Sequence, residues 1–359
     1  PKQLVRDLQG RDYIAKKPDP LSVASVYRGF VSPTALQRNL SDKFQNVKSV
    51  ELETTYLEIL MPIVVKKLFD NLVLAPDNYL HLGADGNVWV LSRMIDNFEE
   101  FLHQKPCIAT RDPDDTGRIP SRESLNLTTD EANIIGQLYA VALVINHGDL
   151  LNSKLLNSGL RRQPDGSLQA AIVDFGMCAH VSYKGRHVDT LAQDDPGFLY
   201  KKTLGVNFFG KTYLEQYNYR HALPFDRMVA PMMMHSLIES LYEMSADDEI
   251  SLMMRQGFEK AITTAIDKLE ENPNLFVEAL VEAREKCSVE SRPNMTALDE
   301  ILTHSFYQAE PEEHNLITIL SGRVYSCLSV LQNFKAGQTL VEQQQQVRDE
   351  YYESQLGLN

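Results

Sequence analysis

Residues 145–156, "INHGDLLNSKLL", directly follow an apolar helical run, and residues 170–176, "AAIVDFG", come shortly afterwards. Asp149 stands beside Gly148, which lets the backbone turn sharply after the helix. Asp174 ends a short apolar run that predicts a buried strand. We therefore expect both carboxylates on loops at the ends of rigid elements.

Two carboxylates in such positions can form a site for Mg²⁺ and phosphate. One acid binds the metal, and the other orients or deprotonates the attacking hydroxyl. Asn152 and Ser153 would add neutral oxygen ligands for the same metal. A simpler interpretation is that Asp149 caps the next turn and His147 complements the dipole at the helix end. The order of the two motifs, with a strand before the second, favours the phosphate site.

Both stretches resemble motifs of the protein-kinase-like phosphotransferase superfamily. Residues 147–152, "HGDLLN", resemble the start of the catalytic loop H-G-D-x-x-x-x-N of aminoglycoside phosphotransferases. Residues 148–153, "GDLLNS", resemble the G-D-R-H-N-S-N-I loop of phosphoinositide 3-kinases, and residues 174–176 resemble the metal-binding D-F-G. The style of the match is similar to that of kinases which intracellular bacterial pathogens secrete into host cells.

The resemblance implies a bilobal α+β fold with a small β-rich N-lobe and a large, mostly helical C-lobe. It implies ATP and Mg²⁺ as cofactors, with Asp149 orienting the acceptor hydroxyl and Asp174 binding the Mg²⁺ that bridges the ATP phosphates. Lys154 departs from the pattern, because it stands where the superfamily has a metal-binding asparagine and it offers no acceptor. Either Asn152 replaces that ligand, or one metal site is incomplete and the chain is a pseudokinase.

The first residues predict a β-hairpin with strands over residues 3–7 and 11–17. The superfamily uses a strand lysine to hold the α- and β-phosphates, and this hairpin offers Lys16 and Lys17. Since side chains alternate along a strand, only one of them can face the cleft. Lys16 is the preferred candidate and Lys17 the alternative. No glycine-rich phosphate loop is present, so we expect it upstream of residue 1 or in a very short form.

The lysine requires a glutamate partner on the helix that follows. A helical pattern runs from about residue 45 to Pro62, where a second helix is expected to start. Glu53 lies beside the apolar stripe of this pattern and is the preferred partner. Glu51 and Glu58 fit the stripe less well.

A second hairpin is predicted between residues 78 and 95, around an Asp-Gly turn. Its second strand leads to the hinge between the lobes, where Ser92 and Met94 would lie near the adenine. Residues 96–104 are predicted to be helical. A capping box at residues 128–131 opens the apolar helix that precedes the catalytic loop.

Three parts are expected along the 359 residues. They are a kinase-like N-lobe (1–95), a catalytic C-lobe (96–225) and a helical C-terminal extension (226–359). The formal net charge of -14 argues against a nucleic-acid partner, because phosphate contacts require a basic surface. The scattered cysteines favour a reducing, intracellular setting, and no apolar run is long enough to be a transmembrane segment.

A small basic cluster of Lys184, Arg186 and His187 follows the D-F-G. Phosphoinositide kinases use basic residues in this place to hold inositol phosphates or a phosphate-rich membrane, and no A-P-E motif of protein kinases follows. The sequence therefore predicts a phosphoinositide or small-molecule kinase that acts peripherally at membranes as a bacterial effector in the host cytoplasm. The alternatives are a degenerate protein kinase, a pseudokinase scaffold that binds nucleotide or a host protein, and another transfer such as AMPylation or glutamylation.

Overall fold

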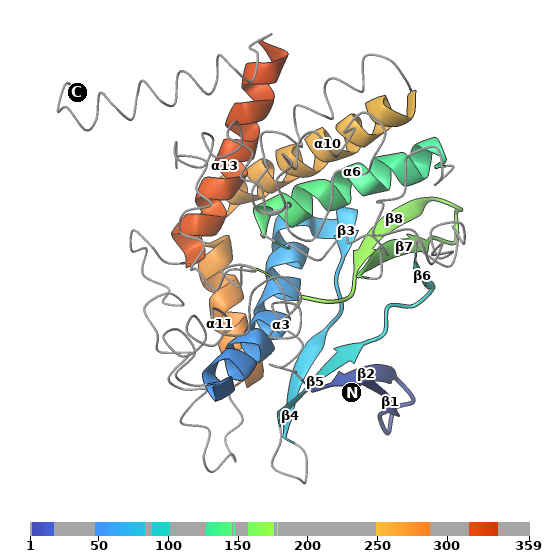
Figure 1. Cartoon of the computed structure of the whole chain (residues 1–359), viewed down its shortest axis with the longest axis vertical. Coiled ribbons are helices and arrows are strands. Elements are labelled where there is room, and N and C mark those ends of the chain that lie inside the picture. The colour runs from blue at the N-terminus through green and yellow to red at the C-terminus, as the bar shows by residue number, and fades with distance from the viewer. Residues whose placement is uncertain are drawn as a thin grey trace, which may run out of the picture.

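The computed structural model shows an α+β protein with two small sheets and five long helices among the residues that it describes (Figure 1). The described residues are 2–17, 47–82, 88–100, 127–145, 147, 157–175, 178, 249–287 and 316–336. Within them, no helix is long and apolar enough to cross a membrane.

The first sheet consists of two hairpins that pair side by side in the order β1-β2-β5-β4. Its strands are β1 (Lys2–Arg6), β2 (Asp12–Lys16), β4 (Asn78–Leu82) and β5 (Val88–Arg93), all antiparallel to their neighbours. Gly10 has a φ of +79°, which suits glycine, in the turn between β1 and β2. The strand pairing of both predicted hairpins is confirmed, and the Asp-Gly turn of the second lies outside the described residues.

The second sheet has the order β3-β8-β7-β6. Its strands are β3 (Val73–Leu74), β6 (Phe98–Glu100), β7 (Ser158–Arg162) and β8 (Leu168–Ile172). The strand predicted before Asp174 is confirmed as β8, but the helix predicted over 96–104 is wrong at β6. The short segment pairs with β7 instead, and it passes so close to Gly159 that an added Cβ would overlap the carbonyl of Glu99.

Helix α3 (Val47–Phe69) continues through Pro62, so the predicted break there is wrong. A proline inside a helix removes one backbone hydrogen bond and costs about 3 kcal/mol or more. Burial of large apolar side chains, each contributing about 1.5–3 kcal/mol, offsets this cost. The buried side chains of α3 include Tyr56, Leu57, Ile59, Leu60, Met61, Ile63, Val64, Val65, Leu68 and Phe69.

Helix α6 (Thr129–Val144) begins with the predicted capping box. The Glu131 backbone N–H donates to the Thr128 hydroxyl at 3.2 Å, and the Thr128 N–H donates to the Glu131 carboxylate at 2.8 Å. The helix is buried along nearly its whole length. Its end therefore has a fixed place in the core, and the candidate catalytic loop starts from there.

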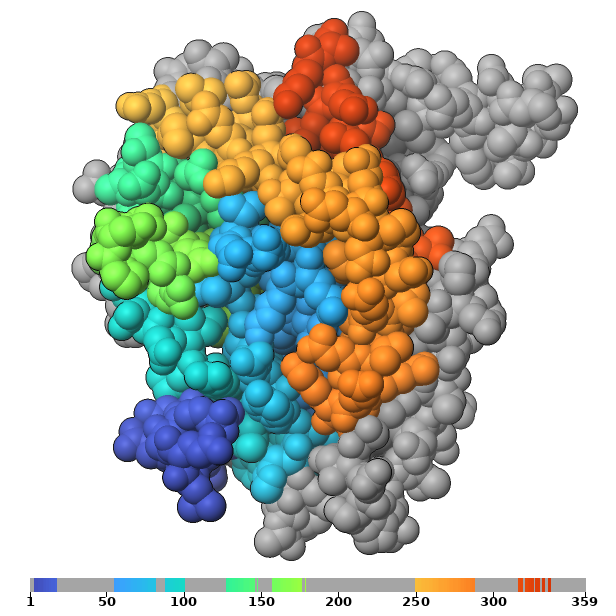
Figure 2. All heavy atoms as spheres, turned by 180° about the vertical axis from the view of Figure 1, so that it is seen from behind, coloured from blue at the N-terminus to red at the C-terminus, as the bar shows by residue number. Residues whose placement is uncertain are grey.

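Three later helices complete the described core: α10 (Glu249–Glu271), α11 (Leu275–Cys287) and α13 (Leu316–Lys335). Helix α10 packs along α6, and α11 lies along α3, as Figure 2 shows from the opposite side. The buried side chains of these helices belong to the same hydrophobic cluster as those of α3 and α6. The C-terminal helices are thus part of the support for the elements that carry the site.

The contact between α6 and α10 depends on glycine. A Cβ added to Gly136 would overlap the carbonyl of Met254, and one added to Gly257 would overlap the carbonyl of Asn133. We expect Gly136→Ala to lower the free energy of unfolding by about 2 kcal/mol, because the two helices must move apart. Urea denaturation measures this change.

Gly322→Ala is the matched control. Gly322 also lies in a helix, but an added Cβ would have no atom within 4 Å. This variant should be more stable than the native chain by about 0.5–1 kcal/mol, since alanine is the better helix former. An equal loss of stability in both variants would contradict the proposed close contact of α6 and α10.

Candidate functional site

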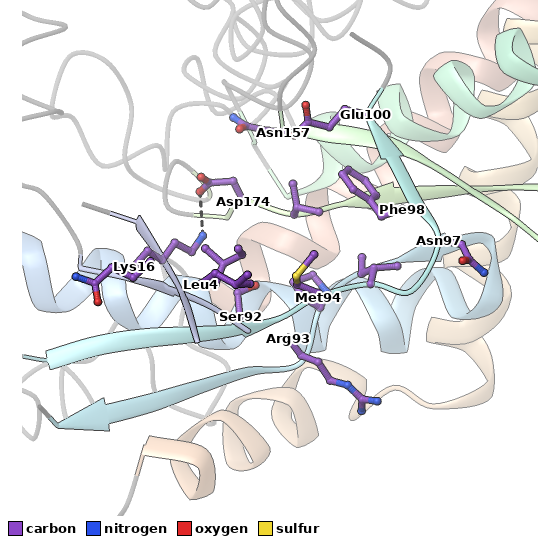
Figure 3. A pocket seen from close by; sticks show the side chains of 15 residues that line it. Leu4, Lys16, Ser92, Arg93, Met94, Asn97, Phe98, Glu100, Asn157 and Asp174 are labelled. Carbon is purple, nitrogen blue, oxygen red and sulfur yellow. Dashed lines mark ion pairs between the residues drawn. The ribbon is translucent and has the colours of Figure 1, made fainter. Parts of the chain in front are cut away.

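A buried lysine joins three separate elements at one point. Lys16, the last residue of β2, places its Nζ 2.7 Å from Oε1 of Glu58 on α3 and 3.4 Å from Oδ1 of Asp174, which follows β8. The side chain of Lys16 is only 11% exposed. Figure 3 shows Lys16 and Asp174 pointing toward one another. Residues far apart in the sequence thus form one cluster of charges.

Glu58 stands in the place for which Glu53 was expected. Besides the ion pair with Lys16, its Oε2 accepts a hydrogen bond from the Phe175 N–H at 3.3 Å. Its backbone carbonyl accepts one from Asn78 of β4 at 2.6 Å. Glu58 therefore ties α3 to the first sheet and to the segment that contains Asp174.

The apolar stripe did not point to Glu58 as the partner of Lys16, because the described side chains of α3 form no single stripe. Between residues 55 and 69 the helix is buried on nearly all sides, so the stripe does not identify the face that meets the sheet. Positions 53 and 58 are five residues apart, which corresponds to a rotation of about 140° about the helix axis, so the two positions lie on different faces. One signal in the sequence was informative: Glu58 is the one charged residue in the apolar run from 55 to 65.

Burial and neighbouring charges shift the pKa values of this cluster. Burial raises the pKa of Glu58 to about 7; the Lys16 ammonium opposes this shift and the Asp174 carboxylate adds to it. Burial lowers the pKa of Lys16, but the charges of Glu58 and Asp174 outweigh it, so that this pKa lies above its ordinary value. Two carboxylates share one ammonium, which gives the ionised cluster an excess of negative charge that a further cation would neutralise.

His147 positions the backbone of Asp174. The imidazole is 1% exposed, and its Nε2 lies at hydrogen-bond distance from the Asp174 carbonyl oxygen. The imidazole also lies near the ring of Phe175, with 6.0 Å between the ring centres. The expected role of His147 as a charge at the helix end is therefore incomplete, because it connects the end of α6 to the segment after β8.

A cavity of about 480 Å³ opens beside the charge cluster. Strands of both sheets and the segments next to them line it: Gln3, Leu4, Ile14, Lys16, Pro76, Ser92, Arg93, Met94, Ile95, Asn97, Phe98, Glu100, Asn157, Val173 and Asp174. Its volume lies within the range of small-molecule sites, and an apolar lining with a few polar groups is typical of them.

Lys16, Ser92, Met94 and Asp174 are the predicted site residues that line this cavity. Lys17, the alternative to Lys16, is not among the lining residues. The lining also includes residues that were not predicted: Leu4, Phe98, Glu100 and Asn157. No local sequence pattern shows that β1, β6 and the start of β7 meet at this cavity. Other residues singled out in the sequence lie outside the described residues: Asp149, Asn152, Lys154, Lys184, Arg186 and His187.

The described residues offer a partial set of ligands for a divalent cation. No group of three or more histidine, cysteine, aspartate or glutamate side chains among them could hold a metal ion. Asp174 faces the cavity with a quarter of its side chain exposed, and Asn157, which also lines it, is a residue with a neutral oxygen donor. This set fits Mg²⁺, which usually takes one or two carboxylates and completes its octahedron with water and phosphate oxygens.

We found no protein-family model that matches this chain and no curated protein with a detectably similar sequence. Among solved structures, the fold is similar to that of a Helicobacter pylori proinflammatory kinase, CtkA, at 10% sequence identity and a TM-score of 0.32. The similarity covers 78% of this chain and 91% of that kinase.

Proposed function

We propose that this protein is an ATP- and Mg²⁺-dependent phosphotransferase with a bilobal, kinase-like fold. The first sheet and α3 would form the small lobe. The observation that carries the proposal is the Lys16 ammonium, held between Glu58 and Asp174 beside a largely apolar cavity. A fixed cation next to a solvent-accessible carboxylate suits a polyphosphate with its metal, and the apolar surface beside them suits a flat base.

The cavity supports a division of roles along the nucleotide. Leu4, Ile14 and Met94 offer apolar surface to an adenine ring, with Val173 as a further contact. Lys16 would hold phosphate oxygens, and its pairing with Glu58 fixes the ammonium in one position before the nucleotide binds. Removing Glu58 would leave that ammonium free to turn toward Asp174 alone.

Asp174, with Asn152 or Asn157 as the candidate neutral ligand, would hold the Mg²⁺. The bound ion would neutralise charge on the phosphates during transfer. His147 keeps the Asp174 backbone in place. Asp149, two residues after His147 in the sequence, would accept the proton of the attacking hydroxyl.

The proposed acceptor is a phosphoinositide or another small hydroxyl compound at a membrane surface. This part rests on the sequence, where Lys184 and Arg186 supply basic groups shortly after the D-F-G. An effector role in a host cell, with a host protein as a further partner, belongs to the same proposal. Lys154 favours a second candidate, a pseudokinase that binds nucleotide without transferring phosphate.

Transfer of labelled γ-phosphate from ATP tests the proposal. We expect label in lipid when phosphoinositide liposomes are offered, and a loss of at least about 10²-fold in Asp149→Ala, because the acceptor hydroxyl loses its base. A mixed cell extract, offered in parallel, tests protein acceptors.

Three other outcomes assign the alternatives. Label in protein rather than lipid would identify a protein kinase. ATP binding without transfer to either acceptor would identify a pseudokinase or a different chemistry. Unchanged lipid labelling after Lys184 and Arg186 are both replaced by Ala would remove their proposed role in holding the headgroup.

A further inference from the structure

Two carbonyls in the last turn of α6 accept hydrogen bonds from a distant helix. Arg323 of α13 donates from Nε to the carbonyl oxygens of Leu143 at 2.7 Å and Val144 at 3.1 Å. Its Nη2 also donates to the Leu143 oxygen. Helix α13 packs against both α6 and α10 (Figure 1), and Arg323 is only 3% exposed.

These bonds complete the end of α6. The last four carbonyls of a helix have no partner inside the helix and require other donors. Here the Val141 oxygen accepts from the Ile145 N–H at 3.0 Å and the Ala142 oxygen from the His147 N–H at 2.9 Å. Arg323 supplies the remaining two, and its positive charge complements the negative end of the helix dipole.

The same helix end leads directly into the candidate site. His147 donates its N–H to the last turn of α6, and its Nε2 lies at hydrogen-bond distance from the Asp174 carbonyl. Polar contacts thus connect Arg323 to the end of α6 and the end of α6, through His147, to Asp174, with the helix backbone between them. A shift of the helix end would move His147 and, with it, the backbone that carries the Asp174 carboxylate.

Packing alone gives no reason for an arginine here. Burial lowers the pKa of Arg323 to about 10, so that the group is charged at neutral pH and its burial is costly. Within the described part of the chain no carboxylate pairs with it and its Nη1 has no hydrogen-bond partner. An apolar side chain of similar size would fill the same space at lower cost. What it would lack is the pair of donors for the Leu143 and Val144 carbonyls.

We infer that Arg323 is a positioning residue for the proposed phosphotransfer site, acting through the end of α6 and His147. The expected effect of Arg323 on the transfer rate rests on the proposed function, whereas its expected effect on the local structure does not. Arg323 gives α13, which lies in the C-terminal extension outside the expected catalytic lobe, a specific part in the site.

Replacing Arg323 by Met tests the inference. In the R323M chain, kcat should fall at least about tenfold while the KM for ATP changes less than about threefold, because Lys16 and the apolar cavity stay in place. Hydrogen exchange should accelerate at least about tenfold at the amides of Ile145 and His147, whose acceptor carbonyls lie in the loosened turn. Exchange in α11, which packs against α3 and β4, should stay unchanged.

Two further variants separate positioning from general loss of stability. Leu331→Ala removes a buried side chain from the same helix about 12 Å along its axis from Arg323, and should leave kcat within about twofold of the native value. Arg323→Lys keeps the charge and one set of donors, so kcat and exchange should lie between those of R323M and the native chain. This variant also serves if R323M does not fold.

A native kcat in both Arg323 variants, or exchange that accelerates equally over α6, α10 and α13, would overturn the inference. If the native chain transfers no phosphate to any acceptor, the proposed function fails while the exchange measurement still decides whether Arg323 holds His147. The two failures are therefore distinguishable.

Discussion

Replacing Asp174 by Asn should reduce phosphoryl transfer by at least about 10³-fold and remove the effect of Mg²⁺ on nucleotide affinity. The substitution keeps the size and shape of the side chain and removes its charge. Asp174 lines the cavity and contacts the Lys16 ammonium. Among the described residues, the only other carboxylate in contact with that ammonium is the buried Glu58. An amide in its place would bind a divalent cation only weakly.

Calorimetric titration with ATP, with and without Mg²⁺, measures this prediction together with the transfer assay. Asp70→Asn is a suitable control, because it removes a carboxylate that forms a solvent-exposed pair with Lys268 away from the cavity. Asn also tolerates the positive φ of 48° found at this position. Nucleotide affinity that still depends on Mg²⁺ in Asp174→Asn would contradict the assignment of the metal to this carboxylate.

Local signals in the sequence predicted much of the fold. The hairpins depend on alternating side chains and turn residues, and the start of α6 depends on the capping box of Thr128 and Glu131. Each of these involves neighbours in the sequence. The strand that ends before Asp174 was predicted for the same reason, since a short apolar run has few other structures open to it.

The errors arose where distant contacts decide the structure. Strand β6 forms because β7 presents Gly159 to it, and α3 continues through Pro62 because the core surrounds the helix. The partner of Lys16 depends on which face of α3 meets the first sheet, and that face is set by packing. Arg323 illustrates the limit most clearly, since its two acceptors lie about 180 positions earlier in the chain.

Replacing Lys16 by Met should reduce the kcat/KM for ATP by about 10²–10³-fold. Methionine fills a similar volume but supplies no charge, so the phosphates lose a cation that Glu58 holds in a fixed position. Two carboxylates would then face each other without the ammonium between them, and the affinity for ATP without metal should fall as well. The transfer assay and calorimetric titration measure the two effects.

Lys17→Met is the matched control for this prediction, because it removes the same charge from the next residue of the chain. Adjacent residues of a strand point to opposite faces, and Lys16 lines the cavity whereas Lys17 does not. We therefore expect Lys17→Met to keep kcat/KM within about threefold of the native value, since loss of a charge outside the cavity acts only through screened, long-range interactions. A large loss in Lys17→Met with a small one in Lys16→Met would assign the phosphate contact to Lys17. Equal small losses in both variants would mean that the ion pair of Lys16 and Glu58 only stabilises the fold.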